Sequence, residues 1–61
     1  MVLIELHTLY GSLWINPNYI SSFCAGAAGG TNVFMANDTS PVQVKEEPEE
    51  ILELIKKALS L

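Results

Sequence analysis

The sequence predicts a small α+β domain. This is an antiparallel β-meander of about four strands, the second one bent at Asn16-Pro17, with one C-terminal amphipathic helix packed on one sheet face. Residues 48–61 repeat apolar side chains at the spacing of a helix, and the segments before them alternate at the spacing of strands. The connections between segments are short, which favours antiparallel neighbours and a helix lying across the sheet. We therefore expect a single ββββα domain over residues 1–61.

The helix predicted at residues 48–61 has the clearest pattern of the chain. At about 100° per residue, its charged side chains fall on one half of the helical wheel and its apolar side chains on the other. Pro48 suits the first helical position, and the glutamates around it favour the positive end of the helix dipole. The side chains expected to pack on the sheet are Ile51, Leu54, Ile55 and Ala58. Those left for a neighbouring subunit are Leu52, Leu59 and Leu61.

The first strand is predicted at residues 2–9, with Ile4 and Leu6 facing the core. Gly11 lies in the turn that follows, where it is free to take a positive φ. The second strand is predicted in two parts, because a proline removes a backbone donor and restricts the residue before it. We expect a bend or one helical turn at Pro17, rather than a long loop.

The second part of the bent strand is predicted at residues 19–24, with Ile20 as its core anchor and Cys24 as a small buried residue. Residues 25–30 contain only alanine and glycine and are predicted to form a flexible hairpin loop. Such a loop binds phosphate where it leads into a helix, but a strand pattern follows it here. That strand, at residues 31–36, is joined by a polar turn to the last strand, at residues 42–45.

The short length and the composition favour self-association. The 61 residues contain one cysteine and one histidine, so they offer neither an internal disulfide nor a His/Cys zinc site. A domain of this size buries only about 60% of the surface that its unfolded chain exposes. Small domains without disulfides or metals are commonly stabilised by a partner chain. Because 49% of the residues are apolar, we expect a homo-oligomer.

The net charge of −4 at pH 7 argues against nucleic acid and against an anionic membrane surface, because few lysines are present to neutralise phosphates. The apolar runs are too short to span a bilayer, and the first ten residues lack the basic start of a signal peptide. We therefore expect a cytoplasmic protein, in a bacterial cell or an infected host cell, with no membrane insertion.

No catalytic combination of residues stands out. Cys24 has no base beside it in the pattern. His7 is expected to be a surface or interface residue, and a pair with Glu5 would bind a proton or a metal only weakly. The glutamates from Glu46 to Glu53 are explained by the helix dipole and a solvated helix face. We therefore expect no enzyme activity, no cofactor and no metal.

Large apolar side chains are expected on the outer face of the sheet. Trp14 and Phe34 alternate with inward-facing neighbours, so they point away from the helix. Leu3 and Leu9 share that face by the same alternation. A patch of this kind is typical of an oligomer interface. The predicted interface comprises Leu3, Leu9, Trp14, Phe34, Leu52, Leu59 and Leu61.

Two segments carry a family resemblance: IELHTLYGSLWINPNYI at residues 4–20 and VQVKEEPEEILELI at residues 42–55. The matching residues are Ile4, Leu6, Leu9, Gly11, Asn16, Pro17, Ile20, Val44, Glu46, Glu49, Glu50 and Ile51. With these residues the chain resembles the small FlbD-like flagellar proteins, also called SwrD. It departs from them at His7, at Glu47 in place of a capping serine, and in the longer stretch at residues 25–30. The resemblance implies the same fold and an accessory role in flagellar motility through protein contacts, without catalytic residues.

Three function classes remain open. The first is a non-enzymatic protein–protein interaction module that binds itself and an unidentified protein, similar to the flagellar accessory proteins. The second is a phage-encoded protein, either a virion or assembly component or a factor that modulates a host protein. The third is a small ligand-binding module, which requires convergent polar residues around a pocket, and the sequence indicates no such set.

Overall fold

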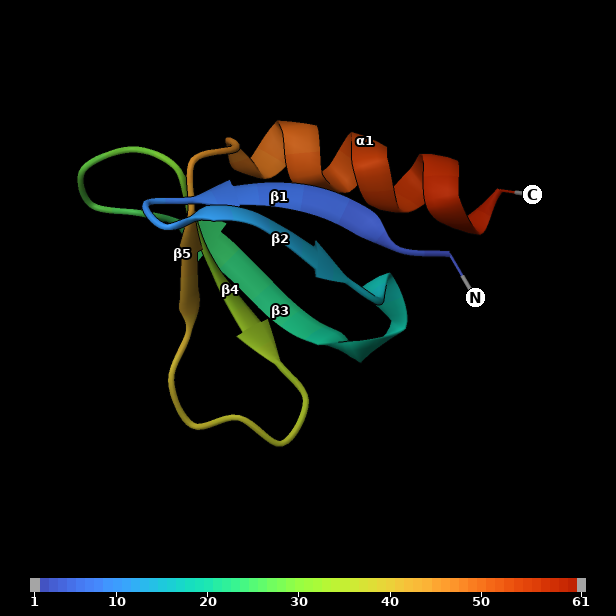
Figure 1. Cartoon of the computed structure of the whole chain (residues 1–61), viewed down its shortest axis with the longest axis horizontal. Helices are drawn as coiled ribbons and strands as arrows, with labels where there is room; N and C mark the ends of the chain where they lie inside the picture. The colour runs from blue at the N-terminus through green and yellow to red at the C-terminus, as the bar shows by residue number, and fades with distance from the viewer. Residues whose placement is uncertain (1, 61) are drawn as a thin grey trace.

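The computed structural model describes residues 2–60 (Figure 1). In chain order, the elements are β1 (Ile4–Thr8), β2 (Gly11–Ile15), the 3₁₀ turn η1 (Pro17–Tyr19), β3 (Ile20–Ala25), β4 (Thr31–Met35), β5 (Val42–Val44) and α1 (Pro48–Leu59). The predicted α+β fold, with antiparallel strands followed by a helix that packs on them, is confirmed. Five strands replace the expected four within this part of the chain, because the bent second strand is divided into β2 and β3.

The turn at Pro17 separates two antiparallel sheets. β1 pairs with β2 in a hairpin, and β3, β4 and β5 form a three-stranded sheet in that order. The Asn16 side chain accepts a hydrogen bond from the Asn18 N–H (2.9 Å), and the Asn16 carbonyl accepts one from the Tyr19 N–H (3.0 Å). These bonds replace strand pairing where proline interrupts it. The bend predicted at Asn16-Pro17 is therefore a 3₁₀ turn between two sheets.

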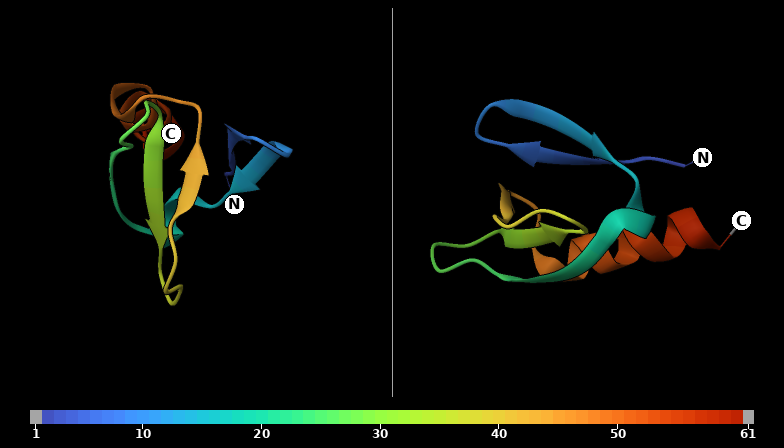
Figure 2. Two further views of the ribbon diagram at one scale, coloured as in Figure 1. Left: turned by 90° about the vertical axis from the view of Figure 1, so that its left-hand side faces the viewer. Right: turned by 90° about the horizontal axis from the view of Figure 1, so that it is seen from below.

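The two sheets and the helix enclose one core. The hairpin lies to one side of the three-stranded sheet, and α1 runs alongside both, in contact with β1 and β3 (Figure 2). The Lys45 N–H donates to the His7 carbonyl (2.7 Å), which joins the end of β5 to β1. The buried apolar residues come from both sheets and the helix: Ile4, Leu6, Ile15, Val33, Val44 and Ile51.

The predicted inner face of the helix is confirmed. Ile51 is fully buried, and the partly buried Leu54, Ile55 and Ala58 pack against the core. Leu52 and Leu59 are exposed, although the helical wheel places both on its apolar half. Pro48 is the first helical residue and Glu47 is the N-cap, so the helix begins where its sequence signals place it. Its last residue is Leu59, and Leu61 lies outside the described residues.

Cys24 is exposed, so the prediction of a buried cysteine is wrong. The register between β3 and β4 shifts between Ile20 and Ser22, which marks a β-bulge. An extra residue in a strand reverses which side chains face inward beyond it. Phe23 consequently packs against the core, opposite the buried Val33, and Cys24 faces outward opposite Asn32.

The loop at residues 26–30 is more constrained than its alanines and glycines indicate. Gly30 is buried with a φ of +70°, and a Cβ at this position would overlap the Val44 carbonyl oxygen. Its N–H donates to Glu47 Oε2 (2.9 Å), which connects the loop to the helix N-cap. Only glycine combines this backbone conformation with so close an approach.

We predict that Gly30→Ala destabilises the protein by about 3 kcal/mol, since it adds backbone overlap to the strain of a positive φ. Gly29→Ala is the matched control, because Gly29 also has a positive φ (+96°) but a Cβ there meets nothing within 4 Å. The control should lose only about 1 kcal/mol. Urea unfolding of both variants measures the difference, and equal losses would contradict the assigned role of Gly30.

Candidate functional site

The fold brings His7 between two carboxylates on the outer side of β1. His7 Nδ1 lies 2.5 Å from Glu46 Oε2, and His7 Nε2 lies 3.6 Å from Glu5 Oε2. The His7 N–H also donates to Glu46 Oε1 (2.9 Å), so both oxygens of this carboxylate contact the same residue. The imidazole is half-exposed, whereas Glu46 is partly buried. We refer to Glu5, His7 and Glu46 as the His7 cluster.

The contacts of the His7 cluster favour its charged form. The hydrogen bond with Glu46 raises the pKa of His7 above its ordinary value of 6.5 more than desolvation lowers it, and the charges of Glu46 and Glu5 act in the same direction as the hydrogen bond. Burial raises the pKa of Glu46, but hydrogen bonds from the His7 side chain and backbone outweigh this and lower it below its ordinary 4.5. Both shifts favour an imidazolium at His7 beside an ionised carboxylate at Glu46.

Ser12 extends the cluster, but not in the order of a hydrolytic triad. Its hydroxyl donates to Glu5 Oε2 (2.7 Å), so it contacts a carboxylate rather than the imidazole. A nucleophilic serine needs its proton directed at a base such as a histidine nitrogen. The arrangement can exchange a proton at His7 and carry charge, and the Ser12 hydroxyl is directed at Glu5 instead of the imidazole. Among residues 2–60, no three His, Cys, Asp or Glu side chains are grouped so as to hold a metal ion.

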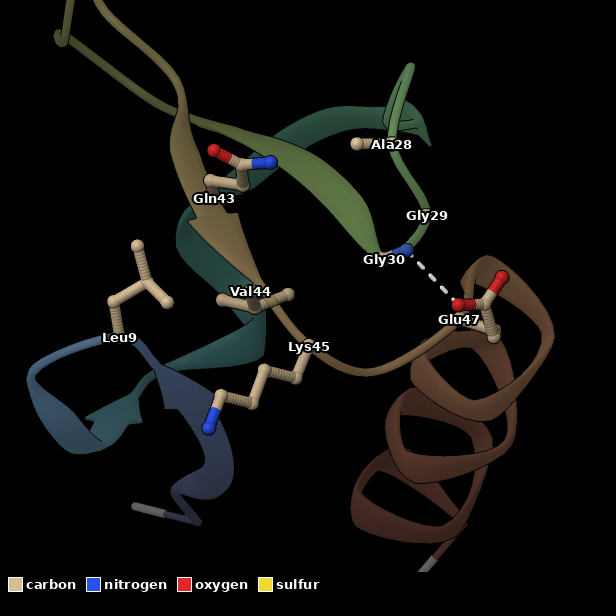
Figure 3. A pocket seen from close by; sticks show the side chains of 8 residues that line it. All are labelled: Leu9, Ala28, Gly29, Gly30, Gln43, Val44, Lys45 and Glu47. Carbon is tan, nitrogen blue, oxygen red and sulfur yellow. Dashed lines mark hydrogen bonds between the residues drawn. The ribbon is translucent and has the colours of Figure 1, made fainter.

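Two open hollows border these elements. The larger one, of about 720 Å³, lies between the His7 cluster and α1, where Glu50, Glu53, Leu54, Lys56, Lys57 and Ser60 complete its lining. The smaller one, of about 350 Å³, lies between the hairpin turn, the loop at residues 26–30 and β5 (Figure 3). It includes the Gly30–Glu47 hydrogen bond, and Leu9 from the hairpin turn borders it. Charged residues line most of the larger hollow, but the surface that they present to it is mainly apolar.

The residues predicted to form the interface are distributed over several elements. Trp14 in β2 is 59% exposed, and Phe34 in β4 is partly buried. The two aromatic residues belong to different sheets, because β2 pairs with β1 and β4 lies between β3 and β5. Leu3 is exposed just before β1. Leu9 is 83% exposed in the turn and not in the strand, because Thr8 Oγ1 accepts the Tyr10 N–H (3.0 Å) and ends β1. Leu52 and Leu59 are exposed on α1, and Leu61 is not among the residues described.

Comparisons of the chain with models of protein families, with curated proteins and with solved structures found no match. In the part of the chain that the structure describes, no helix is both long and apolar enough to cross a membrane.

Sequence reasoning found His7 and Glu5 as a pair but did not include Glu46. Residues 7 and 46 are 39 positions apart, and Glu46 belongs to a run of glutamates that the helix dipole accounts for. The departure from the resembled family at His7 was the one available signal. It marked the position without indicating its partner.

We predict that the thermal midpoint is highest between about pH 4.5 and 6.5. The raised pKa of His7 contributes stability that is fully present below pH 6.5 and is lost as the pH rises through that pKa. The lowered pKa of Glu46 contributes stability that is present above pH 4.5 and is lost as the pH falls through that pKa. Melting curves recorded from well below pH 4.5 to well above pH 6.5, and monitored by circular dichroism, measure both limbs.

His7→Gln is the control for the alkaline limb. This variant keeps an N–H donor but does not titrate, so the fall in thermal midpoint above pH 6.5 should disappear. Parallel falls in the wild type and in His7→Gln would show that another group is responsible.

Proposed function

We propose that this protein is a non-enzymatic protein–protein interaction module that self-associates. The observation that carries the proposal is Trp14, which stays 59% exposed while its strand neighbour Ile15 is buried. An exposed tryptophan on an ordered strand leaves a large apolar area in water, and tryptophan is enriched at the energetic centres of interfaces. Further large apolar side chains are exposed at Val2, Leu3, Leu9, Tyr10, Tyr19, Leu52 and Leu59.

The structural context favours contacts over chemistry as the working mode. The Ser12 hydroxyl is directed at a carboxylate rather than at the His7 imidazole, and the His7 cluster connects β1 to the segment before α1. The large apolar side chains, in contrast, remain exposed to solvent. Burying these side chains against a partner would stabilise the complex in proportion to the apolar area removed from water.

The resemblance to the FlbD-like proteins adds a biological setting to this proposal. It favours a cytoplasmic accessory of flagellar motility that acts through contacts with itself and with a second protein. The matching residues Gly11, Asn16 and Pro17 lie at the hairpin turn and at η1, so the resemblance rests on positions that shape the hairpin carrying Trp14.

We predict that the wild type forms a discrete oligomer and that Trp14→Ala/Phe34→Ala dissociates it at micromolar concentration. Truncating an interface aromatic residue commonly costs more than 1 kcal/mol of binding free energy. Tyr19→Ala is the matched control, because Tyr19 is equally exposed (60%) but lies outside the predicted interface. Light scattering on a sizing column measures the molar mass, and circular dichroism confirms folding. A folded wild-type monomer throughout the accessible concentrations would refute self-association.

A further inference from the structure

β2 is the free edge of the hairpin sheet. It pairs with β1 on one side, and within residues 2–60 no strand pairs with its other side (Figure 2). Ser12 and Trp14 are exposed along this strand. An unpaired strand edge presents backbone donors and acceptors that can extend the sheet with another chain.

The contacts of His7 identify which backbone groups of β2 point outward. The His7 N–H donates to Glu46 and its carbonyl accepts from the Lys45 N–H, so both groups point away from β2. In an antiparallel pair of strands, a residue whose N–H and C=O point away from the neighbouring strand lies opposite a residue whose N–H and C=O also point away from their neighbouring strand. The partner of His7 is Ser12. The outward groups of β2 are therefore those of Ser12 and, two residues further along, Trp14.

The other strand edges are occupied or distorted. β1 and β5 are joined by the Lys45–His7 hydrogen bond. β3 carries the bulge next to Ser21, whose hydroxyl donates to the Phe34 carbonyl (2.9 Å). Charges, prolines and bulges are the usual means of preventing edge-to-edge pairing. Gly11–Ile15 has no charge and no proline, and its pairing with β1 is regular.

We propose that a second copy of this chain adds its β2 to this edge in an antiparallel, two-fold symmetric ladder. This proposal rests on the proposed self-association and names the surface that mediates it. In the register that uses every outward group, Ser12 pairs with Trp14 of the partner subunit and Leu13 lies at the two-fold axis. Each such pair exchanges two backbone hydrogen bonds, which gives four across the interface. The strand is uncharged, so two copies meet without like-charge repulsion.

Replacing Ser12 by proline tests the backbone bonds directly. Ser12→Pro removes an outward N–H while leaving the β1–β2 bonds intact, a position where edge strands tolerate proline. Ser12→Ala is the matched control, since both variants lose the hydroxyl bond to Glu5. Two symmetry-related bonds are lost, so the dimer dissociation constant should rise about tenfold relative to Ser12→Ala. Equal dissociation constants by light scattering would overturn the proposal.

Cysteine crosslinking tests the register and does not depend on the proline variant folding. In a Cys24→Ser background, Leu13→Cys places two thiols at the axis, where the Cα atoms of a non-hydrogen-bonded pair lie about 4.5 Å apart. Ser12→Cys is the control, because its two copies would be separated by roughly 8 Å, beyond disulfide reach. Oxidised dimers should form with Leu13→Cys and not with Ser12→Cys.

The outcomes separate this proposal from the proposed function. A wild-type oligomer that shows neither the proline effect nor the Leu13→Cys crosslink would overturn pairing through β2 and leave self-association standing. A wild-type monomer would overturn both. A crosslink that forms with Ser12→Cys instead of Leu13→Cys would exclude the proposed register.

Discussion

The structure depends on Glu46, through which β1, β4 and the segment leading into α1 are connected. Its carboxylate accepts one hydrogen bond from the His7 backbone and contacts the His7 imidazole, and its carbonyl accepts one from Thr31 Oγ1 (2.7 Å). Thr31 is fully buried at the start of β4. A buried polar group left without its partner costs about 1–3 kcal/mol, so these bonds favour one arrangement of the sheets over the alternatives.

Lys45 and Glu47, on either side of Glu46, reinforce these connections. We refer to residues 45–47 as the junction. Lys45 donates its N–H to β1, and Glu47 accepts the Gly30 N–H while its own N–H donates to Glu50 (3.3 Å). Three consecutive residues thus contact the hairpin, the loop before β4 and the first turn of the helix. The apolar core is small, as expected for a chain of this length, so directional polar bonds at one point help to fix how its layers meet.

Periodicity was sufficient to predict the inner faces of β1 and α1, but not the contacts between the elements. Ile4, Leu6 and Ile51 are buried as their spacing predicts, and Pro17 marks the bend. Glu46 could not be distinguished from its acidic neighbours, because its partner is distant in sequence and carries no local signal. The bulge that exposes Cys24 also lacks a marker, since two serines fit an exposed strand in either register.

The junction also explains why the two sides of the hairpin differ. β1 directs the outward N–H and C=O of His7 toward Glu46 and Lys45, so this edge is used within the chain. The alternation of an antiparallel ladder then directs the corresponding groups of Ser12 and Trp14 away from the protein. The register that directs the backbone of His7 toward Glu46 and Lys45 therefore leaves β2 as an unpaired edge strand that contains Trp14. Self-association through that edge would follow from the internal architecture. The backbone hydrogen bonds of β1 to residues 45 and 46 set the register in which the N–H and C=O groups of Ser12 and Trp14 face a partner.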